Sequence, residues 1–178
     1  MSQVFVSGHK SPDTDSIAAA LSYSYLKRRL GMDAVAVRAG EINKESRFAL
    51  DYFNLEEPML VTSVARKNPE DEKQKVILVD HNESKQTIDF GDFESENPIF
   101  ILVRPVGCVN TVIYGLYKAN HIKPSREIAG IMLSAIISDT VLFRSPTTTE
   151  EDKETAKELA EIAGVDYEAY GMERYKGI

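Results

Sequence analysis

Short apolar runs alternate with longer helical patterns along this chain, and the alternation constrains the fold more than any other feature. The runs with strand composition are residues 4–6, 34–38, 59–62, 76–79 and 99–103. The segments with helical spacing or caps are residues 17–31, 44–53, 107–120, 125–143 and 149–164. This alternation predicts an α/β domain with a doubly wound, mostly parallel sheet flanked by helices. The polar segment 66–75 is predicted to be an exposed loop.

Two of the expected strands are followed by side chains that bind metals. His9, Asp13 and Asp15 follow the strand at 4–6, and Asp80 follows the apolar run at 76–79. In open α/β sheets, ligands bind beyond the carboxyl ends of the strands. One imidazole and three carboxylates at one sheet edge are costly unless a cation neutralises them. Mostly oxygen ligands with some nitrogen suit Mn²⁺, Mg²⁺ or Co²⁺ better than a structural zinc. If one carboxylate bridges, four such groups can hold two metals, an arrangement used for phosphoryl displacement.

Each of these residues also has a purely structural interpretation. Asp13 and Asp15 could cap the helix that follows, His9 could be an ordinary loop residue, and Asp80 could end a strand in a turn. Their joint occurrence at two strand ends favours the metal site. Asp139 lies in the otherwise apolar segment 136–143. It is either a buried carboxylate with a metal partner or a solvated residue at a helix end, and the pattern leaves both open.

Composition excludes several classes of protein. The 178 residues include 28 acidic and 21 basic side chains, a net charge of −7, which argues against binding to nucleic-acid phosphates. A single cysteine, Cys108, excludes a disulfide framework and is typical of the cytoplasm; we interpret it as a packed thiol at a helix start. The sequence has no signal-peptide pattern, no apolar run of about 20 residues, no glycine-rich nucleotide loop and no Gly-x-Ser-x-Gly elbow. We expect a cytoplasmic domain without nucleic-acid or membrane partners.

Several motifs together resemble one known family. They are residues 8–16 (GHKSPDTDS), 79–83 (VDHNE), 105–108 (PVGC), 134–140 (SAIISDT) and 143–147 (FRSPT). In these segments the chain resembles the N-terminal domain of the manganese-dependent, family II inorganic pyrophosphatases of the DHH phosphoesterase superfamily. The resemblance extends over nearly the whole chain, and the first two motifs are the most specific.

The resemblance implies a role for each candidate residue. His9 and Asp13 correspond to ligands of a first metal, and Asp15 and Asp139 to ligands of a second. Asp80 corresponds to the carboxylate that bridges both, so Asp80, Asp13 and Asp15 are the expected catalytic residues. The implied cofactor is a pair of Mn²⁺ ions, with Co²⁺ or Mg²⁺ as alternatives. The implied reaction is hydrolysis of inorganic diphosphate to two phosphates by a metal-activated water, in a homodimer formed through this domain.

The chain departs from the family pattern in two places. The family carries an Asp-His-His motif before the Pro-Val-Gly segment, whereas here Phe90 is followed directly by Gly91 and no His-His pair exists. We interpret this as a segment absent from the sequence rather than as an evolutionary loss. The chain also stops at Ile178, where the family continues into a second domain that binds substrate. We therefore expect residues 1–178 to be a single metal-binding domain.

Two other functions stay open, the second of them because of these departures. One is a different DHH phosphoesterase, acting on short oligonucleotides or cyclic dinucleotides. The other is a non-catalytic module that binds metal or phosphate.

Overall fold

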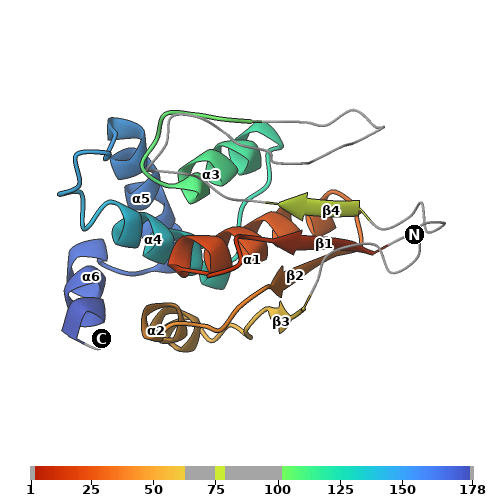
Figure 1. The fold of residues 1–178 in the computed structure, drawn as a ribbon. Coiled ribbons are helices and arrows are strands. Elements are labelled where there is room, and N and C mark those ends of the chain that lie inside the picture. The colour runs from red at the N-terminus through yellow and green to blue at the C-terminus, as the bar shows by residue number, and fades with distance from the viewer. Residues whose placement is uncertain (1–2, 63–74, 79–101, 177–178) are drawn as a thin grey trace.

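The computed structural model describes residues 3–62, 75–78 and 102–176 (Figure 1). Its strands are β1 (Val4–Ser7), β2 (Ala34–Arg38), β3 (Met59–Leu60) and β4 (Lys75–Leu78). Its helices are α1 (Thr14–Arg29), α2 (Lys44–Tyr52), α3 (Val109–Ala119), α4 (Arg126–Asp139), α5 (Glu150–Ala163) and α6 (Tyr167–Lys176). None of the helices in these ranges is long and apolar enough to cross a membrane.

The four strands form one parallel sheet in the order β3-β2-β1-β4, which confirms the predicted α/β class. The chain first adds β2 and β3 on one side of β1 and then places β4 on the other side. This reversal makes the gap between β1 and β4 a topological switch point, where α/β sheets bind their ligands. Ser7 pairs with Val37 on one side and Leu78 on the other, so the carboxyl ends of β1 and β4 meet at one sheet edge.

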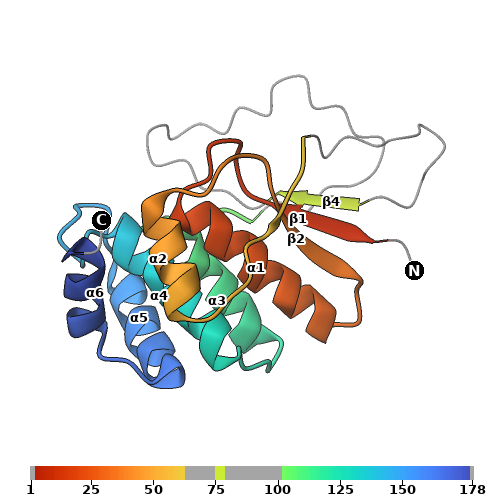
Figure 2. The same cartoon turned by 90° about the horizontal axis from the view of Figure 1, so that it is seen from below.

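The helical part of the molecule is built around α4. Every residue from Ile128 to Ile137 is buried, in agreement with a segment that is apolar nearly all round. Helix α1 packs against β1 and β2, and α4 packs against α1, α3 and α5 (Figure 2). The apolar core is therefore continuous from the sheet through α1 to α4 and α5. This packing brings the beginning of α1 and the end of α4, far apart in sequence, to the same region.

Two predicted elements differ from the structure. The helix expected over 125–143 ends at Asp139, because Val141, Leu142 and Phe143 have positive φ angles of 49°, 53° and 65°. Such left-handed backbone cannot continue a right-handed helix. The strand expected over 99–103 is also wrong where it can be tested, since residues 102 and 103 belong to no strand and residues 99–101 lie outside the described ranges.

The C-terminal part contains one confirmed cap and one helix that the sequence pattern did not predict. Thr149 and Asp152 form the expected capping box at the start of α5, and Gly164 ends that helix with a φ of 68°. Helix α6 follows immediately. The expected loop at 66–75 lies outside the described residues except for Lys75, which begins β4.

Candidate metal centre

Two glycines shape the loop between β1 and α1. A Cβ atom on Gly8 would lie 2.6 Å from Cβ of Ser16, and one on Gly40 would lie 2.4 Å from the carbonyl oxygen of Lys10. Real side chains do not approach so closely, so the loop takes this path only because neither position carries one. Residues 9–13 thereby pass directly from the carboxyl end of β1 to the start of α1.

His9 and Asp13 lie together in this loop. Nε2 of His9 is 3.4 Å from Oδ1 of Asp13, and the side chains are 33% and 50% exposed. Asp13 is also the N-cap of α1, because its Oδ1 accepts a hydrogen bond of 2.9 Å from the backbone N–H of Ser16. The capping interpretation of Asp13 is thus correct. It does not exclude a metal-ligand role, since a carboxylate has about four lone-pair sites.

Asp15 lies two residues after Asp13, in the first turn of α1, and is only 2% exposed. Its Oδ1 accepts hydrogen bonds from Nδ2 of Asn110 at 2.7 Å and from Sγ of Cys108 at 3.0 Å. Asp15 sits in the first turn of α1, and both donors sit at the beginning of α3. Two helix N-termini therefore face this carboxylate, and the positive end of a helix dipole stabilises a negative charge.

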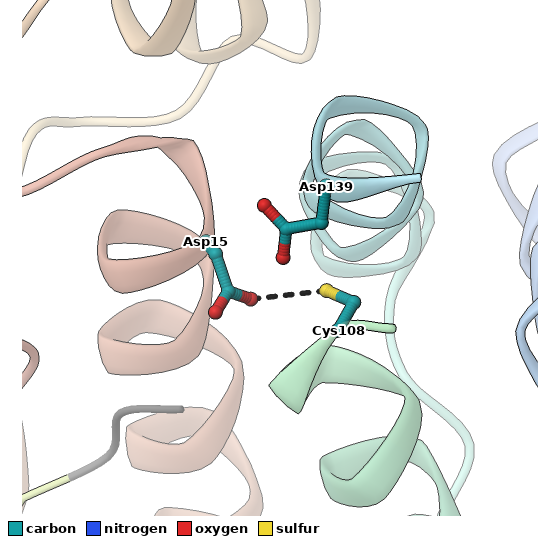
Figure 3. Close-up of side chains that lie close together, drawn as sticks. All are labelled: Asp15, Cys108 and Asp139. Atoms are coloured by element: carbon teal, nitrogen blue, oxygen red, sulfur yellow. Dashed lines mark hydrogen bonds between the residues drawn. The ribbon is translucent and has the colours of Figure 1, made fainter. Parts of the chain in front are cut away.

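Asp139 meets Asp15 at the end of α4. Ligand atoms of Asp15, Cys108 and Asp139 all lie within 4.8 Å of one another (Figure 3). Asp139 is half-buried, the last residue of its helix, and its carboxylate points toward the other two side chains. Asp139 therefore lies at a helix end, as one of the two interpretations of the sequence proposed, but its carboxylate faces another acidic residue rather than only solvent.

Two carboxylates lie close together here, and the backbone at the end of α4 disfavours one of the two negative charges. Asp139 is at the C-terminus of α4, where the helix dipole disfavours an anion, and Asp15 is a second carboxylate close by. A bound divalent cation would offset both the unfavourable helix dipole and the repulsion between the two carboxylates. Carboxylate oxygens and one imidazole are ligands that Mn²⁺ accepts. The oxygen and nitrogen atoms that the structure brings together here therefore fit the metal.

Cys108 is the unexpected member of the group. It is fully buried and is the N-cap of α3, which confirms the predicted packed thiol at a helix start. Burial, together with the nearby charges of Asp15 and Asp139, raises the pKa of the Cys108 thiol well above its usual value. The thiol therefore stays protonated and acts as a hydrogen-bond donor to Asp15. No spacing rule connects positions 15 and 108, so the sequence offered no signal for this contact or for that of Asn110.

Asp80, the predicted bridging ligand, lies outside the described residues, as does the junction between Phe90 and Gly91. The structure therefore places four of the five predicted metal ligands. It brings His9 to Asp13 and Asp15 to Asp139, as two groups at the beginning of α1.

Comparison with known proteins identifies relatives with similar sequences. The model of the DHH family, N-terminal domain, matches residues 3–136. The chain is 49% identical to a "Probable manganese-dependent inorganic pyrophosphatase" of Bacillus licheniformis and 48% identical to one of an Exiguobacterium species. Each alignment covers 99% of this chain and 60% of the relative, so the chain spans less than two thirds of these curated proteins. The alignments run over 191 positions, more than the 178 residues here, so the relatives carry residues without a counterpart in this chain.

Solved structures give a consistent result. The chain is similar to the crystal structure of a "putative family II inorganic pyrophosphatase" from Methanococcus jannaschii, with a TM-score of 0.79 and 40% identity over 98% of this chain and 61% of that one. It also shares its fold with an "exopolyphosphatase-related protein" from Bacteroides fragilis, with a TM-score of 0.64 over 99% of this chain and 55% of that one. The identity to the second protein is 16%, so this likeness concerns the fold alone.

Proposed function

This chain belongs to the DHH family, because the model of that family's N-terminal domain matches it, and we propose that it is the metal-binding part of a manganese-dependent inorganic diphosphatase. The reaction is the hydrolysis of diphosphate to two phosphates. The observation that carries the proposal is the gathering of Asp15 and Asp139, from the beginning of α1 and the end of α4, next to the loop that holds His9 and Asp13.

Each group of residues has its own part in this function. His9 and Asp13 hold the first ion, and Asp15 and Asp139 hold the second. Asp80, outside the described residues, keeps its predicted role as the ligand shared by both. Bound Mn²⁺ supplies an activated water and offsets the charge on the transferring phosphoryl group. The chain's own residues fix where the ions bind. The carboxylate of Asp15 accepts hydrogen bonds from the thiol of Cys108 and the amide of Asn110.

Calorimetric titration with Mn²⁺, combined with an assay of phosphate release, tests the proposal. We expect the 178-residue chain to bind two ions, Asp15→Asn to remove one of them, and His9→Ala to remove the other. Glu56→Gln changes an exposed carboxylate outside both groups and serves as the control with unchanged binding. Titrations in which neither Asp15→Asn nor His9→Ala alters Mn²⁺ binding contradict the proposal.

The choice of substrate separates the proposed activity from its alternatives. Phosphate release from diphosphate, without cleavage of a dinucleotide or a cyclic dinucleotide, supports the diphosphatase. Cleavage of the dinucleotide instead supports another DHH phosphoesterase. Tight Mn²⁺ binding with neither activity supports a metal-binding domain that needs the remaining part of its longer relatives, or a non-catalytic module. Adding the part of the Bacillus licheniformis relative that this chain does not cover distinguishes these last two, because only the first should then release phosphate.

We further propose that this domain forms a homodimer in the cytoplasm, without nucleic-acid or membrane partners. Among the described residues β3 is an edge strand of the sheet, and the 50% and 48% exposure of its Met59 and Leu60 supports the dimer. Exposed apolar edge strands pair with other chains unless they are protected. Sedimentation at micromolar concentration should show a dimer that Leu60→Lys dissociates and Leu30→Lys, on another exposed apolar residue, does not. A monomer in the unsubstituted protein contradicts this part of the proposal.

A further inference from the structure

Asn110 is a fully buried polar residue in the first turn of α3, and it is not one of the predicted metal ligands. A buried side-chain amide lowers stability unless its donors and acceptor find partners. Within the described part of the chain, the Asn110 side chain finds these partners on α1. Its Nδ2 donates to Oδ1 of Asp15 at 2.7 Å and to the backbone carbonyl of Asp15 at 3.3 Å, and its Oδ1 accepts from Oγ of Ser22 at 3.0 Å.

These contacts fix the orientation of the amide. A carboxylate oxygen only accepts hydrogen bonds, so the nitrogen of Asn110 must face Asp15 and its oxygen must face Ser22. A flipped amide would place two oxygen atoms against each other at a distance of 2.7 Å. Ser22 and Asp15 are seven positions apart on the same face of α1, and the side chain of Asn110 spans them from the neighbouring helix.

The geometry points to a positioning role: we propose that Asn110 holds the carboxylate of Asp15 in the orientation in which it receives the second metal ion. This inference rests on the proposed function, since it needs Asp15 to be a ligand. Cys108 donates to the same oxygen, Oδ1, so two groups from α3 hold that side of the carboxylate. The carboxylate then lies beside Asp139 before any ion arrives (Figure 3).

Two consequences follow for metal binding. A hydrogen bond from an amide to a charged carboxylate is stronger than one between neutral groups, so it offsets part of the cost of burying Asp15. It also reduces the reorganisation needed when the metal binds. Removal of partners that orient a metal ligand typically lowers metal affinity by roughly 10- to 100-fold. This is the loss expected on removal of the Asn110 amide.

The alternative is that Asn110 only joins α1 to α3. The next residue, Thr111, provides a matched comparison because it is also buried and donates to a buried carboxylate, Oδ1 of Asp152, at 2.6 Å. Asp152 caps α5 and is not a predicted ligand. Asn110→Leu and Thr111→Val each replace a polar side chain by an apolar one of similar shape and take one donor from a carboxylate. If Asn110 only joins the two helices, Asn110→Leu and Thr111→Val should have the same effect on stability and on Mn²⁺ affinity.

The experiment is a calorimetric titration of the 178-residue chain with Mn²⁺, accompanied by thermal unfolding of the metal-free proteins. Asp15→Asn first identifies which of the binding events belongs to Asp15. We expect Asn110→Leu to lower the affinity of that event by roughly 10- to 100-fold while leaving the other event unchanged. Thr111→Val should lower the melting temperature without changing either affinity. Ser22→Ala, which frees the amide to rotate, should cause a smaller loss in the same event.

Unchanged affinity in Asn110→Leu, or an equal loss in Thr111→Val, overturns the inference while the proposed function stands. If Asp15→Asn itself leaves Mn²⁺ binding unchanged, the proposed function fails and the inference fails with it. If Asn110→Leu does not fold, Asn110→Ser and Ser22→Ala are titrated instead. A loss confined to the Asp15 event then supports the inference, and unchanged affinity in both variants overturns it.

Discussion

His9 and Asp13 lie in one loop, four residues apart and partly exposed, whereas Asp15 and Asp139 come from two helices and meet in the interior. The first group is mostly local: it needs a strand end, a helix start and Gly8, and from further along the chain it needs Gly40 to leave room for the loop. The second group needs α1, α3 and α4 to be packed together, because its members and their hydrogen-bond donors lie on all three helices. Mostly local interactions shape the first group, and tertiary packing assembles the second.

The largest effect that bears on this comparison is expected from Asp80, which lies outside the described residues. If it bridges the two ions, Asp80→Asn should disturb both groups, because an amide offers one neutral oxygen and a nitrogen that ligates poorly. We expect tight binding of the second Mn²⁺ to be abolished, the first to be weakened, and any diphosphatase activity to fall by orders of magnitude.

Titration with Mn²⁺ and circular dichroism of Asp80→Asn check this prediction. The fold should survive, because the substitution removes a charge from a crowded acidic region. Wild-type affinity for both ions would show that Asp80 does not link the two groups and that they bind independently.

The proximity of His9 and Asp13 could be predicted from the sequence because the signals around them are local. A strand, a polar loop and a capped helix follow one another within residues 4–17, and each has its own residue preferences. The apolar stretch around Asp139 also made this residue a candidate ligand, with a solvated helix end as the alternative, and only the resemblance assigned it to the second metal. The apolar pattern around Asp139 did not reveal that Asp15 is its neighbour.

What the sequence pattern missed depends on contacts between distant segments. Helix α6 contains Gly171, which lowers helix propensity, and it is stabilised by packing: Leu142 fills the space beside Gly171, and the ring of Phe143 contacts that of Tyr167 with centroids 5.6 Å apart. The same contacts hold the left-handed turn that ends α4 early. The turn and α6 therefore depend on each other, and propensity predicts neither.

An intermediate effect is expected from Gly40, which tests whether the first group is local. A Cβ in Gly40→Ala would meet the carbonyl oxygen of Lys10 at 2.4 Å and Cδ of Pro12 at 2.7 Å, both rigid backbone-linked groups. The loop must shift, at a cost of roughly 1–3 kcal/mol in the free energy of unfolding. We expect weaker binding of the ion held by His9 and Asp13 and unchanged binding at Asp15.

Gly115→Ala is the matched control for Gly40→Ala. The nearest atom to a Cβ at Gly115 lies 3.8 Å away, and alanine in the interior of α3 should stabilise the protein by up to about 1 kcal/mol. Denaturant unfolding and Mn²⁺ titration of both variants measure the two effects. Equal losses of affinity at both ions in Gly40→Ala would mean that the groups are not separable.

The smallest effect is expected at the turn after Asp139. Val141 has a φ of 49° and a side chain that is 48% exposed, so its backbone is strained and its side chain packs little. Left-handed backbone costs an L-residue about 1–2 kcal/mol, and glycine avoids this cost while losing about 0.5–1 kcal/mol through greater freedom of the unfolded chain. Val141→Gly should therefore stabilise the protein by up to about 1.5 kcal/mol, with a rise in melting temperature of roughly 2–4 °C per kcal/mol.

The same substitution should affect the two ligand groups differently. A glycine beside the end of α4 holds Asp139 less firmly, so we expect a slight loss of Mn²⁺ affinity at the second group and none at His9 and Asp13. Val103→Gly, at an exposed valine without positive φ, is the control and should not raise the melting temperature. If Val141→Gly instead lowers stability as much as Val103→Gly does, the left-handed turn carries no strain. The early end of α4 is then determined by the packing of Leu142 and Phe143 alone.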